Sequence, residues 1–104
     1  PKQGRLVVGL EDNEIARSLQ NISVYPNPAK GTFFLQVPEE LIGRGEWKLL
    51  DQRGVSVRTG KFQDAKNGVI QVAVGDLPES IYIVALTGPN NTFIYKKIML
   101  LRER

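Results

Sequence analysis

The 104-residue chain alternates short strand-like runs with clusters of turn residues, and this pattern constrains its fold more than any other feature. A period of two places alternate side chains on opposite faces of a strand. The runs stop at Gly, Pro and Asn, as at the Asn-Gly pair 67–68, a strong hairpin signal. No long helical pattern interrupts them. The expected strands are residues 21–25, 32–37, 46–51, 55–62, 69–74, 81–87 and 92–101.

These strands predict an all-β fold, an immunoglobulin-like antiparallel β-sandwich of about seven strands. Tyr82 follows Pro78 at the start of a strand, which is the place of the tyrosine corner in such sandwiches, although a tyrosine that is simply buried is the alternative. Phe33 and Phe34 are neighbours, so only one can face the core. The near-continuous apolar run 81–87 predicts a central strand that is buried on both faces.

The first twenty residues differ from the rest of the chain. They are polar for much of their length, and Pro1 stands where a start methionine would be, so we expect a piece of a longer precursor. Ile15 and Leu19 are four apart and allow one helical turn, which is too short to be stable alone. We therefore expect residues 1–20 to be a lead-in and residues 21–104 to form the domain.

Composition excludes several classes of chemistry. The chain has no Cys and no His, which removes disulfides, thiolate nucleophiles, imidazole bases and the metal sites built on them. Adjacent carboxylates such as Glu39 and Glu40 do not face each other across a cleft as a catalytic pair does. We expect no catalytic residue, no cofactor and no metal, and therefore no enzyme.

Charge and hydropathy restrict the partners. The net charge is +3, but the basic residues are spread along the chain, so nucleic acid is not the expected partner. No apolar run approaches the roughly 18 residues of a membrane-spanning helix. From the residues alone, the chain is a small module for attachment, sorting or binding.

Four segments follow one another along the chain: "ISVYPNPAKGTFFLQV", "KLLDQRGVSVRTGKF", "IQVAVGDLPESIYIVAL" and "FIYKKIMLL". Together they resemble the C-terminal signal domains of the type IX secretion system, an outer-membrane export route of certain Gram-negative bacteria. The resemblance covers about residues 22–101 and includes the Tyr-Pro-Asn-Pro sequence at its start. One departure is Ser80, in a slot where the family commonly has Gly; a positive φ there would cost about 1 kcal/mol.

The resemblance implies a sorting role. The precursor would cross the inner membrane, fold in the periplasm and be recognised by the type IX translocon, then reach the cell surface or be secreted. A sortase-like peptidase of the surface complex would usually remove the domain and join the cargo to anionic lipopolysaccharide. The recognition residues that it implies are Tyr25, Pro26, Asn27, Pro28, Asp51, Gly54, Leu77, Tyr82, Lys96 and Lys97. An adhesive or carbohydrate-binding module of a cell-surface protein is the alternative function.

Two local expectations follow. Pro26 and Pro28 fix φ and lack a backbone donor, so they should end the first strand and leave a rigid, exposed corner. That corner is either structural only or also presented for recognition. The last strand and tail, 96–104, form a second candidate surface if they lie at a sheet edge. Any cleavage is expected within residues 9–20, because a protease needs exposed, extended chain.

Overall fold

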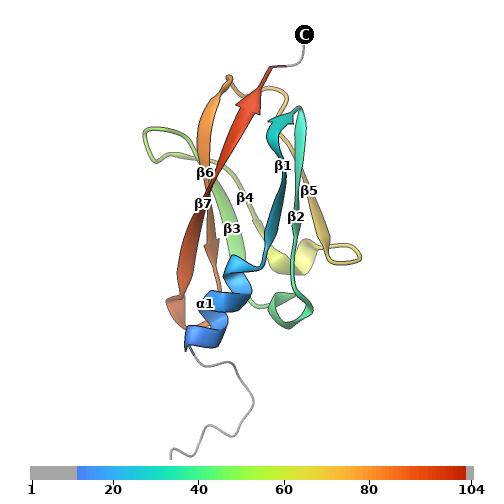
Figure 1. The fold of residues 1–104 in the computed structure, drawn as a ribbon, viewed down its shortest axis with the longest axis vertical. Coiled ribbons are helices and arrows are strands. Elements are labelled where there is room, and N and C mark those ends of the chain that lie inside the picture. The colour runs from blue at the N-terminus through green and yellow to red at the C-terminus, as the bar shows by residue number, and fades with distance from the viewer. Residues whose placement is uncertain (1–11, 103–104) are drawn as a thin grey trace, which may run out of the picture.

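The computed structural model describes residues 12–102 and shows two β-layers packed face to face, with a helix across one end (Figure 1). The all-β sandwich predicted from the strand pattern is confirmed, with seven strands. The elements in chain order are α1 (Asp12–Gln20), β1 (Ser23–Lys30), β2 (Thr32–Gln36), the 3₁₀ helix η2 (Glu39–Leu41), β3 (Glu46–Leu50), β4 (Ser56–Lys61), η3 (Phe62–Asp64), β5 (Val69–Ala73), β6 (Ser80–Thr87), η4 (Pro89–Asn91) and β7 (Phe93–Leu101).

The strands are hydrogen-bonded in the order β4-β3-β6-β7-β1-β2-β5, and this ladder passes from one layer to the other within β1. Residues 23–25 of β1 pair antiparallel with β2, and so does Lys30 next to the turn, whereas residues 29 and 30 also pair parallel with β7. β1 therefore belongs to both layers, and the change occurs at Pro26–Pro28. In Figure 1, β1 diverges from the lower half of β7 toward β2.

The prediction that Pro26 and Pro28 end the first strand is wrong. The strand continues to Lys30, where it pairs with β7 in addition to β2. A proline cannot donate to a ladder, but it adopts the extended φ of a strand. The Pro-Asn-Pro segment therefore interrupts the hydrogen bonding of β1 without interrupting its extended path.

The core lies between the two layers and contains the inward side chains of both. Phe33 and Leu35 of β2 are fully buried, whereas Phe34 between them is half-buried, as the alternation predicted. The turn prediction at Asn67-Gly68 is also confirmed, since both residues have positive φ (55° and 80°). The fully buried large side chains are Phe33, Phe62, Ile15, Leu19, Ile22, Leu35, Leu41, Leu49, Leu86, Ile98 and Val84.

The expectation that 81–87 is buried on both faces is wrong. β6 lies centrally, between β3 and β7, and it buries Tyr82, Val84 and Leu86 on its inner face. Ile81 on the outer face is 44% exposed. The reason is that the described sandwich has two layers, and no third layer covers the outer face of β6.

Helix α1 closes one end of the sandwich. Its Ile15 and Leu19 are fully buried, and a Cβ on Gly88 would lie 3.2 Å from the Ile15 methyl carbon. The Ser18 hydroxyl donates to the Glu40 carboxylate at 2.7 Å. Tertiary packing thus stabilises a helix too short to form alone. Residues 12–20, expected in the lead-in, join the core; residues 1–11 lie outside the described residues, and the boundary at residue 21 stays a prediction.

The helices within residues 12–102 are also informative about membranes. None of them has the length and apolar character required to cross a bilayer.

Candidate recognition surface

The structure brings most of the ten predicted recognition residues into two groups. One lies where β1 meets β7, and we call residues 25–28 of β1 the proline corner. The other lies around the β3–β4 turn, and we call it the turn group. The first group is Tyr25, Pro26, Asn27, Pro28 and Lys97; the turn group is Asp51, Gly54, Leu77 and Tyr82; Lys96 contacts the connection between α1 and β1.

All four residues of the proline corner are exposed. Both proline peptide bonds are cis. The Tyr25 ring stacks on Phe34 of β2, with ring centroids 5.6 Å apart and planes inclined by 28°. The corner therefore presents a tyrosine and two prolines whose conformations are restricted by the ring contact and by fixed φ.

Asn27 connects the proline corner to β7. Its side-chain amide donates to the Lys97 carbonyl at 3.3 Å and accepts from the Met99 backbone N–H at 3.0 Å. In a continuous parallel ladder, the backbone of residue 27 would make these two bonds. The side chain thus replaces its own peptide group at the change of layer. The sequence did not predict this role, because the two bonds span 70 and 72 residues.

Lys96 ties β7 to the start of β1. Its ammonium donates to the carbonyls of Gln20 and Ile22, each at 2.7 Å. Burial lowers the pKa of Lys96 below its usual value. Lys97 projects from the opposite face and is exposed. The two adjacent lysines therefore have different surroundings, and Lys97 is the accessible one.

Asp51 shapes the β3–β4 turn. Its carboxylate accepts from the backbone N–H groups of Arg53 (2.8 Å) and Val55 (3.0 Å), and it forms an ion pair with the Arg53 guanidinium at 2.9 Å. The hydrogen bond from the Arg53 side chain, followed by that from Val55, holds the pKa of Asp51 below its usual value. Gly54 has the positive φ (83°) that the turn prediction required.

Tyr82 forms the predicted tyrosine corner. Its hydroxyl donates to the Pro78 carbonyl at 2.7 Å, and the residue is 3% exposed. Leu77 and Tyr82 lie with Asp51 around a depression of about 410 Å³. Since Tyr82 is buried, its contribution is to position the loop before β6 rather than to touch a partner.

Ser80 is accommodated without strain. It opens β6, and the non-glycine residues with positive φ among the described residues are Asn67, Asn90 and Asn91. Its hydroxyl accepts from the Gln52 side chain at 2.9 Å. A glycine is therefore not required at this position in this chain.

Tyr82 makes a testable contribution to the pH dependence of the free energy of unfolding. Burial, followed by the charges of Asp51 and Asp76, raises the pKa of Tyr82 above 10.0. The fold favours the protonated phenol, so its contribution is complete below about pH 10 and declines as the pH rises through the folded pKa. We expect Tyr82→Phe to lower the free energy of unfolding by about 0.5–1.5 kcal/mol at neutral pH. The difference from wild type should shrink above about pH 10 in urea titrations.

Lys96 changes the free energy of unfolding in the opposite direction as the pH rises, because its lowered pKa favours the neutral amine in the folded state. It is present in both proteins, so its contribution cancels in the comparison. A difference between Tyr82→Phe and wild type that stays constant into the alkaline range would contradict the assignment.

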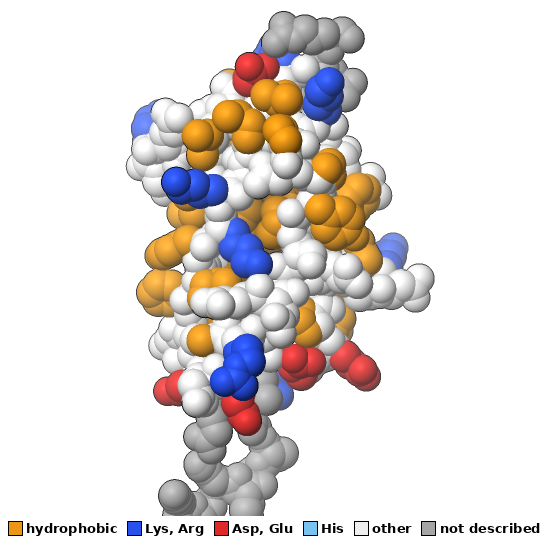
Figure 2. Space-filling view, viewed as in Figure 1, with side chains coloured by type: hydrophobic (Ala, Val, Ile, Leu, Met, Phe, Trp, Pro, Cys, Tyr) orange, Lys and Arg blue, Asp and Glu red, His pale blue; other side chains and the backbone are white. Residues whose placement is uncertain are grey.

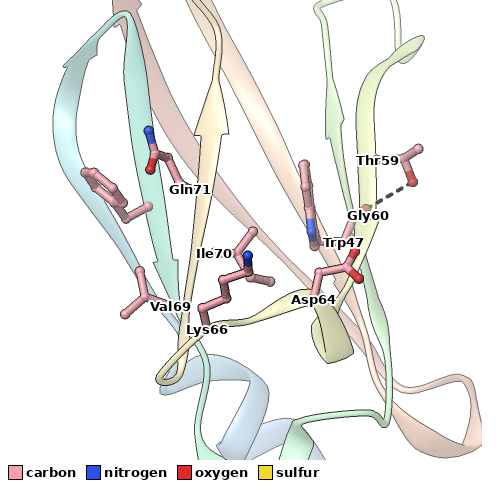
Figure 3. A pocket seen from close by; sticks show the side chains of 9 residues that line it. Trp47, Thr59, Gly60, Asp64, Lys66, Val69, Ile70 and Gln71 are labelled. Carbon is pink, nitrogen blue, oxygen red and sulfur yellow. Dashed lines mark hydrogen bonds between the residues drawn. The ribbon is translucent and has the colours of Figure 1, made fainter.

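A second hollow lies between the edges of β4 and β5 (Figure 3). It measures about 500 Å³, and Figure 3 shows Trp47 and Gly60 on one side with Ile70 and Gln71 opposite. The Trp47 indole N–H is buried and has no partner among the described residues. A Cβ on Gly60 would lie 2.6 Å from that nitrogen, so the close approach of β4 requires glycine.

Arg58 connects the same two edges. Its guanidinium donates to the carbonyls of Ala73 on β5 (3.0 Å) and Val57 on β4 (2.8 Å), and it pairs with Asp76. The sequence did not indicate this bridge, because alternation alone does not show which two edges face each other across a sandwich.

The chemical repertoire of these hollows is limited. Asp64 is the carboxylate that lines the β4–β5 hollow, and it accepts from the Lys61 backbone N–H at 3.3 Å. Across residues 12–102, no three metal-binding side chains gather. The arrangement provides surfaces and turns for contact.

Comparison with known proteins completes the assignment. The family model described as "Secretion system C-terminal sorting domain" matches residues 23–100, which run from the start of β1 almost to the end of β7. No curated protein matches the chain. The match includes both the proline corner and the turn group, and therefore both layers of the sandwich. This chain belongs to the family of C-terminal sorting domains of the type IX secretion system.

Proposed function

We propose that the domain is a non-catalytic signal whose exposed surface is recognised by the type IX translocon. The observation that carries this proposal is the family match, because it extends over the whole sandwich rather than over one short motif. The described hollows offer a partner shape and hydrogen-bonding groups.

The two groups of residues have different roles in this proposal. Tyr25, Pro26, Pro28 and Lys97 are exposed and are the residues we assign to contact with the translocon. Restricted rings and prolines lose little conformational entropy when they dock. The turn group instead shapes the fold, since its carboxylate and its tyrosine hydroxyl are both engaged internally.

The route follows from the same proposal. The precursor crosses the inner membrane, passes through the periplasm and is delivered to the cell surface or secreted. A sortase-like peptidase of the surface complex then removes the domain and joins the cargo to anionic lipopolysaccharide. The net charge of +3 is suited to an anionic surface.

Helix α1 limits the position of the cleavage. Ile15 and Leu19 are buried, so a peptidase reaches the peptide bonds of 12–20 only after α1 has left the sandwich. Within the expected range 9–20, cleavage before Asp12 therefore requires a smaller rearrangement of the described domain than cleavage inside α1 does.

A reporter fusion tests the sorting function. We expect a reporter with an inner-membrane export signal, followed by residues 1–104, to reach the exterior of a host that has the type IX system. The same reporter without the domain is the control and should stay in the periplasm. Periplasmic retention of both, while the host still exports its own substrates, would reject the sorting function and favour the adhesive module.

A further inference from the structure

β7 has two edges, and its pairing with β6 determines which backbone groups reach each one. The bond from the Gly88 N–H to the Thr92 carbonyl (2.8 Å) begins the ladder. In an antiparallel pair, every second residue bonds to the neighbouring strand. The even-numbered residues of β7 therefore bond to β6, in the register Tyr82↔Ile98 and Leu86↔Ile94. The odd-numbered residues direct their N–H and C=O groups to the other edge.

The upper part of that second edge is occupied. Ala29 and Lys30 pair there with Leu100 and Leu101. Below them, the Asn27 amide takes the Met99 N–H and the Lys97 carbonyl. The edge of β7 is thus filled from its end down to the Lys97 carbonyl.

The lower part of the edge has lost its strand. β1 pairs with β7 only at Ala29 and Lys30, and its residues 23–25 pair with β2 alone, so the two strands separate at the proline corner. The groups left open are the Lys97 N–H and the N–H and C=O groups of Tyr95 and Phe93. No described residue forms a hydrogen bond with any of them. This row is the place that β1 would fill if it had stayed beside β7.

The side chains around this row are accessible. Tyr95 is 60% exposed and Phe93 is 54% exposed, with their ring centroids 5.6 Å apart. Lys97 follows Tyr95 on the same face of β7, and it forms no ion pair with a described carboxylate. In Figure 2, hydrophobic side chains and lysines or arginines follow the length of the molecule, while most of the visible acidic side chains gather near the end covered by α1.

The outer edge of β5 differs from the lower edge of β7, because both of its ends are blocked. The Arg58 guanidinium occupies the Ala73 carbonyl at one end of β5, and the paired bonds between Lys66 and Val69 occupy the other end. Such blocking is how proteins commonly protect sheet edges from added strands. Helix α1 packs against β7, but no described side chain hydrogen-bonds to the open backbone groups at the lower edge of that strand.

We propose that an extended segment of the translocon adds to the sandwich as a strand along Phe93–Lys97 of β7. This inference rests on the proposed sorting function and specifies the surface and the partner. Backbone hydrogen bonds would provide the attachment, as in other cases of strand addition. The segment has apolar side chains beside Phe93 and Tyr95 and a carboxylate beside Lys97, because that lysine has no described acidic partner.

A proline at Tyr95 tests the inference. Tyr95→Pro removes an N–H that points away from β6, so the β6–β7 ladder keeps its bonds. Thr59→Pro is the matched control. The bond from the Phe62 N–H to the Gly45 carbonyl shows that the odd-numbered residues of β4 direct their N–H groups away from β3, so the Thr59 N–H lies at the outer edge. Thr59→Val accompanies it, because either substitution also removes the bond from the Thr59 hydroxyl to the Trp47 carbonyl (3.2 Å). We expect Tyr95→Pro to reduce export of the reporter fusion by up to about tenfold, and Thr59→Pro to leave it near wild type.

The outcomes are separable. A wild-type fusion that is not exported rejects the sorting function itself. A wild-type fusion and a folded Tyr95→Pro fusion that are exported equally reject the edge of β7. If Tyr95→Pro does not fold, Lys97→Glu replaces it, since this exposed charge reversal leaves the backbone unchanged; export equal to wild type would then overturn the inference.

Hydrogen exchange of the free 104-residue chain gives a readout without the secretion system. We expect fast exchange for the Tyr95 amide and slow exchange for the amides of Ile94 and Lys96, which bond to β6. Slow exchange at Tyr95 in the monomer would show that the edge is already occupied. A dimer in sedimentation that Tyr95→Pro dissociates would show that a second copy uses the edge, which also overturns the proposal.

Discussion

Replacing Leu19 with alanine is expected to lower the free energy of unfolding of the domain by about 2–5 kcal/mol. Leu19 is fully buried, and its two terminal carbons lie 3.4 and 3.5 Å from the position of a Cβ on Gly88. Truncation removes apolar contact and leaves a cavity between α1 and the sandwich. Urea denaturation of the full chain measures the change. Gln20→Ala is the control, because Gln20 is exposed on the same helix.

This measurement decides whether α1 is part of the cooperative unit. Leu19→Ala with a loss below about 0.5 kcal/mol, equal to that of Gln20→Ala, would show that the helix does not stabilise the sandwich. The expected loss would instead place residues 12–20 within the folding unit. A peptidase that acted inside α1 would then destabilise the domain that it releases.

Replacing Asn27 with alanine is expected to cost about 1–3 kcal/mol, because two hydrogen bonds of about 0.5–1.5 kcal/mol each are lost. It should also increase the exchange rate of the Met99 amide, which donates to the Asn27 side chain. Asn27→Asp is the matched variant: it keeps an acceptor for the Met99 N–H and loses the donor to the Lys97 carbonyl. Its stability is therefore expected to lie between those of alanine and wild type.

The two readouts test the bridging role of Asn27 separately. Unchanged stability together with an unchanged Met99 exchange rate would mean that the Asn27 side chain does not replace the backbone hydrogen bonds of the ladder. A faster Met99 amide with little loss of stability would mean that water substitutes well for the side chain at this exposed position. The same variant lengthens the open edge of β7, so a folded Asn27→Ala that is still exported would agree with recognition along that edge.

Local sequence determined the elements of this protein. Period-two alternation identified the strands and predicted that only one of Phe33 and Phe34 faces the core, because side-chain direction along a strand depends only on neighbouring residues. Asn67-Gly68 and Gly54 identified turns, since positive φ is inexpensive for these residue types. The tyrosine corner at Tyr82 was predictable because Tyr82 and Pro78 are close in the sequence. The family resemblance followed from the order of four such local segments.

The tertiary structure alone decided which edges meet and which stay open. Pro26 and Pro28 were visible as an interruption, but the chain by itself did not show that β1 passes from one layer to the other there. The Asn27 bridge and the Arg58 bridge join segments that are far apart in sequence, so no local pattern encodes them. Whether Ile15 and Leu19 form an isolated turn or a core helix likewise depends on the sandwich that receives them, because a helix of this length is stable only when its apolar face is packed.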